Sequence, residues 1–259
     1  MNASELKHFA ECGVRAVDVS GTLIREYNRK PFQVEVKGDG SPVTSVDQLV
    51  EDQMREIISA EHPDHGILGE ERQAYAPDSE FVWVIDPIDG TLAFLAGIPV
   101  FGTLLALLHN GAPVLGIIDM PMTGERWIGA DGLQTTRNGK PVRSRPCADL
   151  SMALMSTSNP DYYDRTNAPT LERMKKATRF AVYGGSCMFY AQIASGRVDI
   201  CIDVQFEVHD YLALIPVVQG AGGVFTNWQG RAAGLHSGSQ CIAAGDPRAH
   251  EQALKILAG

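Results

Sequence analysis

The first part of the chain alternates apolar and polar positions with the period of an α-helix. Apolar side chains recur with helical spacing over 3–28 and again over 45–60, which predicts two amphipathic helices. The polar stretch at 33–44 contains Gly and Pro and predicts a loop between these helices. The segment HPDHGILGEE at 62–71 is rich in turn residues and predicts a second connection.

From residue 81 onward the pattern changes to that of β-strands. The run FVWVID at 81–86 is apolar, carries aromatic and β-branched residues, and ends before a proline. Further apolar segments are separated by turn signals, including an Asn-Gly pair at 110–111 that is typical of hairpins. We expect these segments to form the strands of a meander: 100–109, 113–119 and 125–130.

In the second half of the chain, strand and helix patterns alternate. The expected strands lie near 152–155, 179–183, 198–203, 223–226 and 240–243. The expected helices lie near 168–177, 186–195 and 210–221, with a last one from 247, and Pro216 should bend the third. Alternation of this kind favours a layered arrangement, so we expect an α/β (α+β) fold. We expect two halves that form one compact unit: an α+β half over 1–145 and an α/β half over 146–259.

Composition limits the possible partners of the chain. The net charge of −9 argues against binding to nucleic acid or to an anionic membrane surface. The five cysteines are odd in number and include no CxxC pair, so we expect neither a disulfide framework nor a zinc knuckle, and we expect a reduced cytoplasm. We also expect no signal peptide and no membrane span, because no apolar run approaches about 20 residues.

The strongest local feature is the segment DPIDGT at 86–91. Asp86 and Asp89 stand three residues apart just after a predicted strand, where Pro87 and Gly90 shape a turn. Such a turn can direct both carboxylates and a backbone carbonyl toward a hard divalent cation. Thr91 opens a possible short helix, whose free N–H groups favour a phosphate. The alternative is a simple Asx turn.

Other acidic residues in loops are weaker candidates on their own. Glu70 and Glu71 have a plain alternative as exposed glutamates. Asp47 could belong to a helix cap at 44–47, and Asp210 could be the N-cap of the late helix. The seven histidines show no HxxxH or HExxH spacing, which argues against zinc.

In order and spacing, these pieces resemble the inositol monophosphatase family. The resemblance rests on Lys37, PVTSVD at 42–47, GEE at 69–71, WVIDPIDGT at 83–91, and Asp210 before a helix that ends in GAGG. Within the family the chain is most similar to bacterial histidinol-phosphate phosphatases, through HPDHGILGEE, YGGSCMFYAQIASGRVDI and HDYLALIPVVQGAGG. The resemblance implies a layered αβαβα sandwich, and by the same analogy a homodimer.

The resemblance also implies a metal-dependent hydrolysis of a small phosphate monoester. Two or three Mg²⁺ ions would be held by these residues: Glu70, Asp86, the Ile88 carbonyl, Asp89 and Asp210. The catalytic residues would be Asp47, Thr91 and Glu70, with Thr91 paired to Asp47 to deprotonate the attacking water. The substrate-binding residues would be Gly90, Thr91, Ser186, Asp203 and Asp210.

The identity of the alcohol stays open at this point. The histidinol-phosphate branch usually has an acidic residue where this chain has Ser186, and Glu where it has Gln219. Asp203 suits either the hydroxyls of inositol or the ammonium of histidinol. Histidinol phosphate is our first hypothesis, and inositol 1-phosphate or another sugar phosphate is the alternative. A different class is a regulatory protein that associates with the transcription machinery, as some bacterial relatives do.

Overall fold

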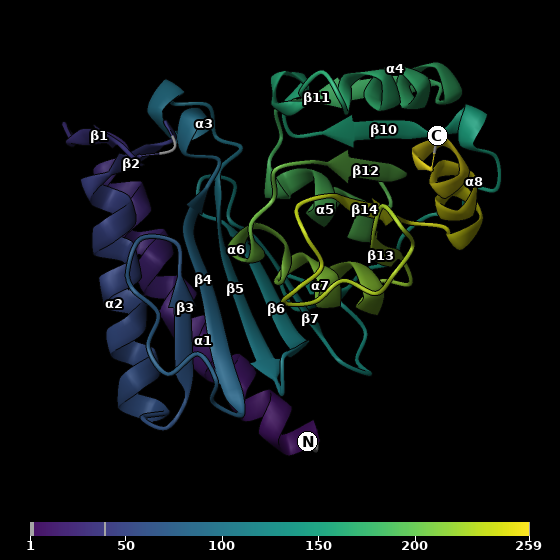
Figure 1. Cartoon of the computed structure of the whole chain (residues 1–259). Coiled ribbons are helices and arrows are strands. Elements are labelled where there is room, and N and C mark those ends of the chain that lie inside the picture. Colours follow the sequence, from purple (N-terminus) through teal and green to yellow (C-terminus); the bar gives the residue numbers. More distant parts are fainter. Residues whose placement is uncertain (1–2, 39, 259) are drawn as a thin grey trace.

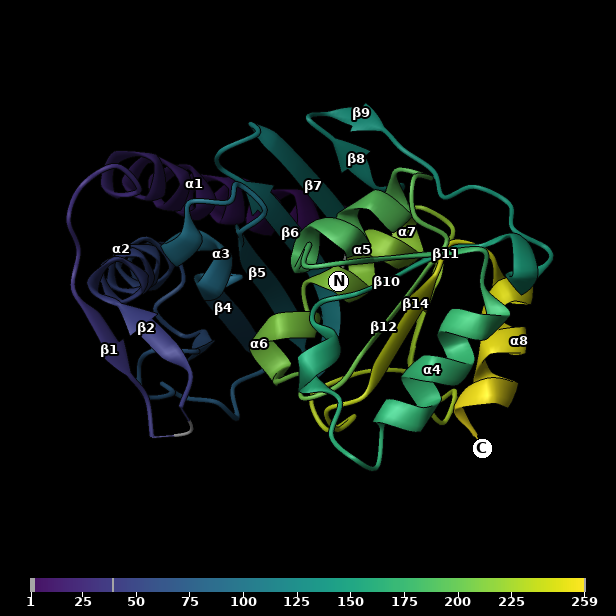
Figure 2. The ribbon, with the colours of Figure 1, turned by 90° about the horizontal axis from the view of Figure 1, so that it is seen from above.

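Five stacked layers of helices and sheets make up the part of the chain that this computed structural model describes, residues 3–38 and 40–258. Figures 1 and 2 show helices on the outer face of a large sheet, further helices between two sheets, and helices outside the second sheet. The predicted layered αβαβα arrangement is therefore confirmed. Among the described residues, no helix combines the length and the apolar character needed to cross a membrane.

The first two layers hold the N-terminal part of the chain. The outer helices are α1 (Ala3–Tyr27) and α2 (Ser45–Glu61). The large sheet has the order β3-β4-β5-β6-β7-β8-β9, and only β3 and β4 run parallel in it. Its strands are β3 (Gly66–Gly69), β4 (Phe81–Asp89), β5 (Gly102–His109), β6 (Ala112–Met120), β7 (Glu125–Ala130), β8 (Thr136–Arg137) and β9 (Lys140–Pro141).

The other three layers come from the C-terminal part. The middle helices are α5 (Cys187–Ala194), α6 (Val208–Tyr211) and α7 (Leu214–Gly220). The second sheet, in spatial order, consists of β11 (Phe180–Tyr183), β10 (Leu154–Thr157), β12 (Ile200–Asp203), β14 (Cys241–Ala244) and β13 (Val224–Asn227). The last layer is α4 (Ala168–Ala177) and α8 (Pro247–Leu257). Outside the layers lie the hairpin β1 (Val34–Val36) and β2 (Pro42–Thr44), helix α3 (Thr91–Ala96), and 3₁₀ turns at Leu150–Met152 and Pro160–Tyr162.

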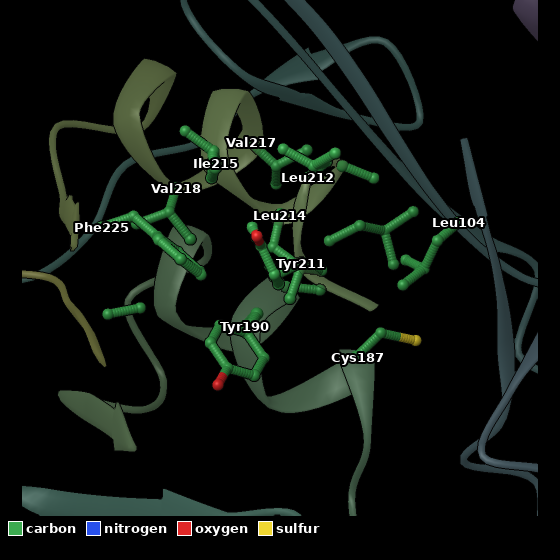
Figure 3. Packing of buried hydrophobic residues seen from close by; sticks show 14 of the residues in the cluster. Leu104, Cys187, Tyr190, Tyr211, Leu212, Leu214, Ile215, Val217, Val218 and Phe225 are labelled. Carbon is green, nitrogen blue, oxygen red and sulfur yellow. The ribbon is translucent and has the colours of Figure 1, made fainter. Parts of the chain in front are cut away.

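Each interface between helices and sheets has its own apolar cluster. One cluster joins α1 and α2 to the large sheet, and another lies beneath α4 and α8. The third fills the space between the two sheets around α5, α6 and α7. Figure 3 shows this third cluster, in which the rings of Tyr190 and Phe225 lie with their centroids 5.8 Å apart. Burial of apolar area on both sides of each sheet holds the layers together. The division of the chain at residue 145 stays a prediction.

Three local expectations were wrong. The connection at 62–71 contains the strand β3, and the loop at 33–44 contains the hairpin β1–β2. The predicted helix over 210–221 is divided into α6 and α7. Pro216 explains the division, because it has no N–H to donate to the carbonyl four residues earlier, that of Leu212, where α6 has ended.

Helix α7 approaches the large sheet closely because a glycine faces it. A Cβ atom built on Gly116 of β6 would lie 2.0 Å from the carbonyl oxygen of Ala213. Only a residue without a side chain allows this contact. The contact fixes the height of the segment 208–220 above the sheet, and with it the position of Asp210.

Candidate functional site

The site is built around an irregularity at the end of β4. Asp86 pairs with Leu104 of β5 and Asp89 pairs with Gly102, so β4 contains one residue more than its partner in this interval. Such a bulge bends the strand and redirects its side chains. Both aspartates thereby leave the regular alternation of the strand and approach one another.

Three carboxylates from distant parts of the chain converge here. Asp86, Asp89 and Asp210 each offer an oxygen, and these oxygens lie within 4.8 Å of one another. Burial, together with the charges of Glu70, Asp89 and Asp210, raises the pKa of Asp86 well above its ordinary value. Burial also raises the pKa of Asp89 to about 6 and that of Asp210 to about 7. The protein therefore concentrates negative charge in a buried place, where it is costly without a counterion.

These residues fit hard divalent cations. The donors are carboxylate and carbonyl oxygens, which Mg²⁺ and Ca²⁺ prefer. The Oδ1 atom of Asp86 is buried, and the described residues offer it no hydrogen-bond partner. A buried acceptor without a partner needs an explanation, and a bound cation supplies one.

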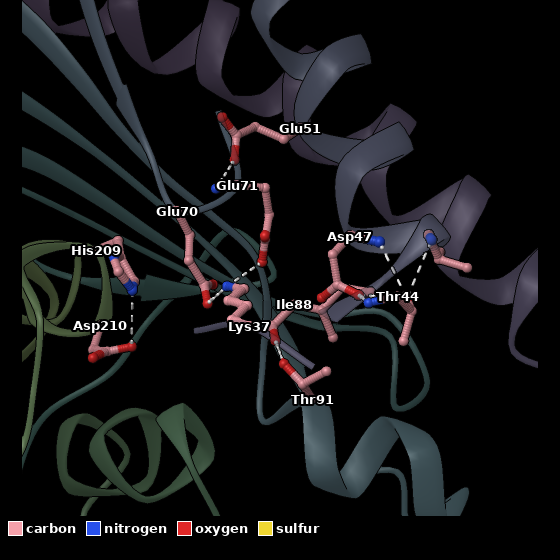
Figure 4. Close-up of polar contacts among 11 residues, drawn as sticks. Lys37, Thr44, Asp47, Glu51, Glu70, Glu71, Ile88, Thr91, His209 and Asp210 are labelled. Atoms are coloured by element: carbon pink, nitrogen blue, oxygen red, sulfur yellow. Dashed lines mark hydrogen bonds and ion pairs between the residues drawn. The ribbon is translucent and has the colours of Figure 1, made fainter. Parts of the chain in front are cut away.

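Lys37 and two glutamates lie at the edge of the same site. The ammonium of Lys37 donates 2.7 Å hydrogen bonds to Oε1 of Glu70 and to Oε1 of Glu71 (Figure 4). These bonds raise the pKa of Lys37, although burial alone would lower it. Burial raises the pKa of Glu71 to about 7 against the effect of Lys37. The backbone N–H of Glu71 donates to Oε2 of Glu51 in α2. This bond ties the backbone of Glu71 to α2.

Asp47 is held by the cap of α2. Its Oδ2 accepts hydrogen bonds from the backbone N–H and from the hydroxyl of Thr44, in a capping box that was the simpler alternative for this residue. Its other oxygen, Oδ1, is buried and has no partner among the described residues. Burial raises the pKa of Asp47 to about 6. Asp47 can therefore serve the helix cap through Oδ2 and the site through Oδ1.

Among the described residues, no direct hydrogen bond joins Thr91 to Asp47, so their expected pairing stays a prediction. The hydroxyl of Thr91 donates to the carbonyl of Ile88 at 3.3 Å, as Figure 4 shows. Thr91 begins α3, and a hydroxyl in a tight turn readily bonds the backbone three residues earlier. The bond places the Ile88 carbonyl and the Thr91 side chain at one point of the DPIDGT turn.

The DPIDGT turn contacts the start of α5. Gly90 has φ 88°, a conformation that favours glycine, and a Cβ atom there would lie 2.7 Å from Oγ of Ser186. Ser186 itself has φ 45° and ψ −138°, which is unusual for a residue with a side chain. The backbone N–H of Cys187 donates to Oδ2 of Asp89 at 2.6 Å. The structure thus brings Ser186 beside the predicted phosphate-binding turn.

Asp210 is the third residue of α6 rather than its cap. Its Oδ2 accepts a 2.7 Å hydrogen bond from the backbone N–H of Glu207, the true N-cap residue. The Nε2 atom of His209 lies 3.7 Å from Oδ1 of Asp210 (Figure 4). Helix α6 therefore orients the carboxylate of Asp210 in the same way that the cap of α2 orients Asp47.

Asp203 lies deeper than a substrate contact would suggest. Its side chain is 1% exposed at the end of β12. Its oxygens accept hydrogen bonds from Thr157, from the backbone and hydroxyl of Ser158, and from the hydroxyl of Tyr190. In this structure Asp203 organises the strand ends around it, and its role toward substrate stays a prediction.

Two further residues near the site, Tyr162 and Glu207, were not among the predicted site residues. The phenol of Tyr162 lies close enough to Asp89, Asp210 and Asp203 that their charges, after burial, raise its pKa. Glu207 is exposed at the start of α6, three residues before Asp210. Both come from irregular segments without periodicity, so only the fold could bring them to the site.

Comparisons with known proteins agree with this geometry. The model of the inositol monophosphatase family matches residues 5–258. The chain is 41% identical to "Bifunctional phosphatase IMPL2, chloroplastic" of Arabidopsis thaliana, over 99% of this chain and 77% of that protein. It is 32% identical to a histidinol-phosphatase of Chlorobaculum parvum, over 85% of this chain and 86% of that protein. An inositol monophosphatase structure from Zymomonas mobilis superposes with a TM-score of 0.90 at 37% identity, over 100% of both chains.

The family that the sequence motifs indicated is thereby confirmed, and the structural similarity covers both sheets and the site between them. The chain belongs to the inositol monophosphatase family.

Proposed function

We propose that the chain is a Mg²⁺-dependent phosphomonoesterase that hydrolyses a small phosphorylated alcohol. The family is generally metal-dependent, and similar proteins are named as phosphatases. The observation that carries the proposal is the convergence of Asp86, Asp89 and Asp210 within 4.8 Å, with a buried oxygen of Asp86 left without a partner.

Two or three Mg²⁺ ions would be held by these groups: the carboxylates of Glu70, Asp86, Asp89 and Asp210, and the carbonyl of Ile88. When bound, Mg²⁺ supplies positive charge to the phosphate oxygens and lowers the pKa of water in the site. Lys37 balances the charge of Glu70 and Glu71 beside it. It therefore steadies the position of Glu70 as a ligand.

The residues of the chain bind the phosphate and take up the proton. Backbone N–H groups of Gly90 and Thr91 lie at the start of α3, where free donors favour an anion. Water attacks phosphorus and Oδ1 of Asp47 accepts a proton from this water. The bond to the alcohol oxygen breaks, and this oxygen takes a proton from solvent water to leave as the alcohol. A pKa of about 6 suits a base that works near neutral pH. Glu70 is a second candidate for accepting that proton.

Histidinol phosphate is the substrate that we favour. In support, one relative is a histidinol-phosphatase and another is a bifunctional phosphatase, while the similar solved structure is an inositol monophosphatase. Glu207 and Tyr162, near Asp210, add an acidic and a phenolic group that suit the ammonium of histidinol. Inositol 1-phosphate is the alternative.

A comparison of kcat/KM for L-histidinol phosphate and inositol 1-phosphate, both with Mg²⁺, tests this choice. We expect at least about a tenfold preference for histidinol phosphate, the size that one well-placed charge contact gives. A preference of that size for inositol 1-phosphate would overturn the choice of substrate but would leave the proposed phosphatase activity intact. No turnover of either compound or of any other small phosphomonoester would overturn both.

We also propose that the chain forms a homodimer through the edge strand β11. Phe180 and Tyr183 of this strand are 62% and 39% exposed, and β11 lies at the edge of the second sheet. Exposed apolar edge strands pair readily with another chain. Light scattering should give twice the monomer mass, and Phe180→Lys should give the monomer.

A further inference from the structure

A second group of metal-ligand side chains lies where α1 meets the end of α2. Cys12 of α1, Glu61 at the last position of α2, and His62 directly after it each offer a ligand atom, and these atoms lie within 4.8 Å of one another. Figure 1 shows α1 and α2 side by side on the outer face of the sheet. The 17 residues of α2 span about 25 Å between this cluster and the cap that holds Asp47. The cluster is therefore separate from the catalytic site.

One atom of the cluster lacks a partner. Within residues 3–38 and 40–258, three buried side-chain atoms have no hydrogen-bond partner: Oδ1 of Asp47, Oδ1 of Asp86 and Nε2 of His62. The two aspartates belong to the catalytic site, where a cation and a reacting water explain them. His62 is only 9% exposed, and the catalytic site cannot explain its unpaired nitrogen.

The ring of His62 is held in place by neighbouring aromatic rings. It stacks on His65 with centroids 4.5 Å apart and meets Phe9 edge-on at 5.2 Å. These ring contacts hold the imidazole in one orientation.

The donor set differs in kind from that of the catalytic site. A cysteine sulfur, an imidazole nitrogen and a carboxylate oxygen are the ligands of zinc-type ions, whereas Mg²⁺ prefers oxygen alone. We propose that Cys12, Glu61 and His62 form a binding site for a zinc-type divalent ion that joins α1 to the end of α2. Zinc bonds of about 2.0–2.3 Å place tetrahedral ligands roughly 3.5 Å apart. Because the ligand atoms lie within 4.8 Å of one another, each pair needs to close by at most about 1.3 Å.

Neighbouring side chains complete the environment. Arg15 donates to both oxygens of Glu61, through Nε at 2.8 Å and through Nη2, and holds the carboxylate in position. Each of those oxygens keeps a lone pair for a metal. His8 precedes Cys12 by one helical turn, and its ring centroid lies 5.5 Å from that of His62. A water would take the fourth position of the site.

Cys12 has no other evident chemical role. It is fully buried, and burial and the charge of Glu61 raise the pKa of its thiol to about 12. A thiol of this kind is a poor nucleophile. An entering metal ion displaces the thiol proton, as it does at other cysteine sites.

Cobalt provides the direct test, because Co²⁺ bound to a thiolate shows a sulfur-to-metal charge-transfer absorption. The whole chain is titrated with Co²⁺ in the presence of excess Mg²⁺, which occupies the catalytic carboxylates, and Zn²⁺ is then added as a competitor. We expect one Co²⁺ per chain with the thiolate band, displaced by Zn²⁺, and a rise in the melting temperature with either ion.

Cys12→Ala is the decisive variant, and Cys241→Ala is its matched control, since Cys241 is equally buried but lies outside the cluster. We expect Cys12→Ala to lose the band and at least about tenfold in affinity, while Cys241→Ala keeps both. His62→Gln should weaken binding with the band still present. A wild-type chain without a thiolate band overturns the proposal, even if Cys12→Ala fails to fold. A band that survives Cys12→Ala also overturns it.

Discussion

The backbone N–H of Cys187 donates a 2.6 Å hydrogen bond to Oδ2 of Asp89, across 98 residues of sequence. It ties the start of α5 to the turn after β4, so the middle helices set the orientation of a candidate metal ligand. Ser186, the residue before Cys187, is placed against Gly90 by the same contact. A change at the start of α5 should therefore act on both the metal ligands and the phosphate-binding turn.

Asp86→Asn should nearly abolish hydrolysis while leaving the chain folded. We expect kcat to fall by at least about a thousandfold, because the central ligand loses its charge. Without Mg²⁺ the variant should melt at the same temperature as the wild type or higher, since a buried carboxylate among like charges is removed. Activity assays and thermal melts by circular dichroism measure the two effects.

Asp78→Asn is the control for that substitution, because Asp78 is an exposed acidic residue. It should leave activity and melting temperature unchanged. Wild-type activity in Asp86→Asn would remove Asp86 from the proposed ligand set.

The stability of the chain without Mg²⁺ should fall as the pH rises. The pKa values of Asp89 and Asp47 lie at about 6 and that of Asp210 at about 7, above the ordinary value near 4. A group whose pKa is raised by folding contributes stability below its unfolded pKa, and this stability is lost as the pH rises through the folded pKa. The loss should fall between about pH 4 and pH 7.

Melting temperatures measured in a chelator at about pH 5 and about pH 8 check this expectation. The value should drop by several degrees, and excess Mg²⁺ should restore most of the loss at the higher pH. Equal melting temperatures at the two pH values in the chelator would show that the carboxylates are not crowded as described.

Gly116→Ala should destabilise the fold. The new methyl group would meet the carbonyl of Ala213 at 2.0 Å, so α7 must move away from β6. We expect a loss of about 1–3 kcal/mol in the free energy of unfolding, measured by urea denaturation. Gly38→Ala, where a Cβ meets nothing within 4 Å, should change it by less than about 1 kcal/mol. Similar values for both variants would disprove the close approach.

Ser186→Asp should shift the choice of substrate toward histidinol phosphate. Asp at this position would adopt the same strained backbone that Ser186 already adopts. A carboxylate beside Gly90 should attract the ammonium of histidinol, and we expect the ratio of kcat/KM values for histidinol phosphate and inositol 1-phosphate to rise about tenfold.

Ser186→Ala separates this effect from the loss of the hydroxyl, and it should leave the ratio nearly unchanged. An unchanged ratio in Ser186→Asp would mean that position 186 does not contact the alcohol.

Prediction from sequence succeeded where a short segment carries both the chemistry and its geometry. In DPIDGT the spacing of Asp86 and Asp89 anticipates a shared site, because the turn that joins them is local. The helices α1 and α2 were also predicted, since their apolar periodicity extends over many residues.

The remainder depends on contacts between distant parts of the chain. Asp203 looked like a substrate ligand, yet its partners Thr157 and Tyr190 come from two other elements. The histidine spacing argued against zinc, whereas the fold brings Cys12 of α1 beside His62, the residue after α2. No local pattern encodes such proximity.

The most direct test of the central claim is a crystal structure with Mn²⁺ in place of Mg²⁺ and with inorganic phosphate, read by anomalous diffraction. The account predicts at least two ions about 2.0–2.3 Å from oxygens of Glu70, Asp86, Asp89 and Asp210, with phosphate at the start of α3. Ions bound elsewhere, with Asp210 turned away from the DPIDGT turn, would contradict it.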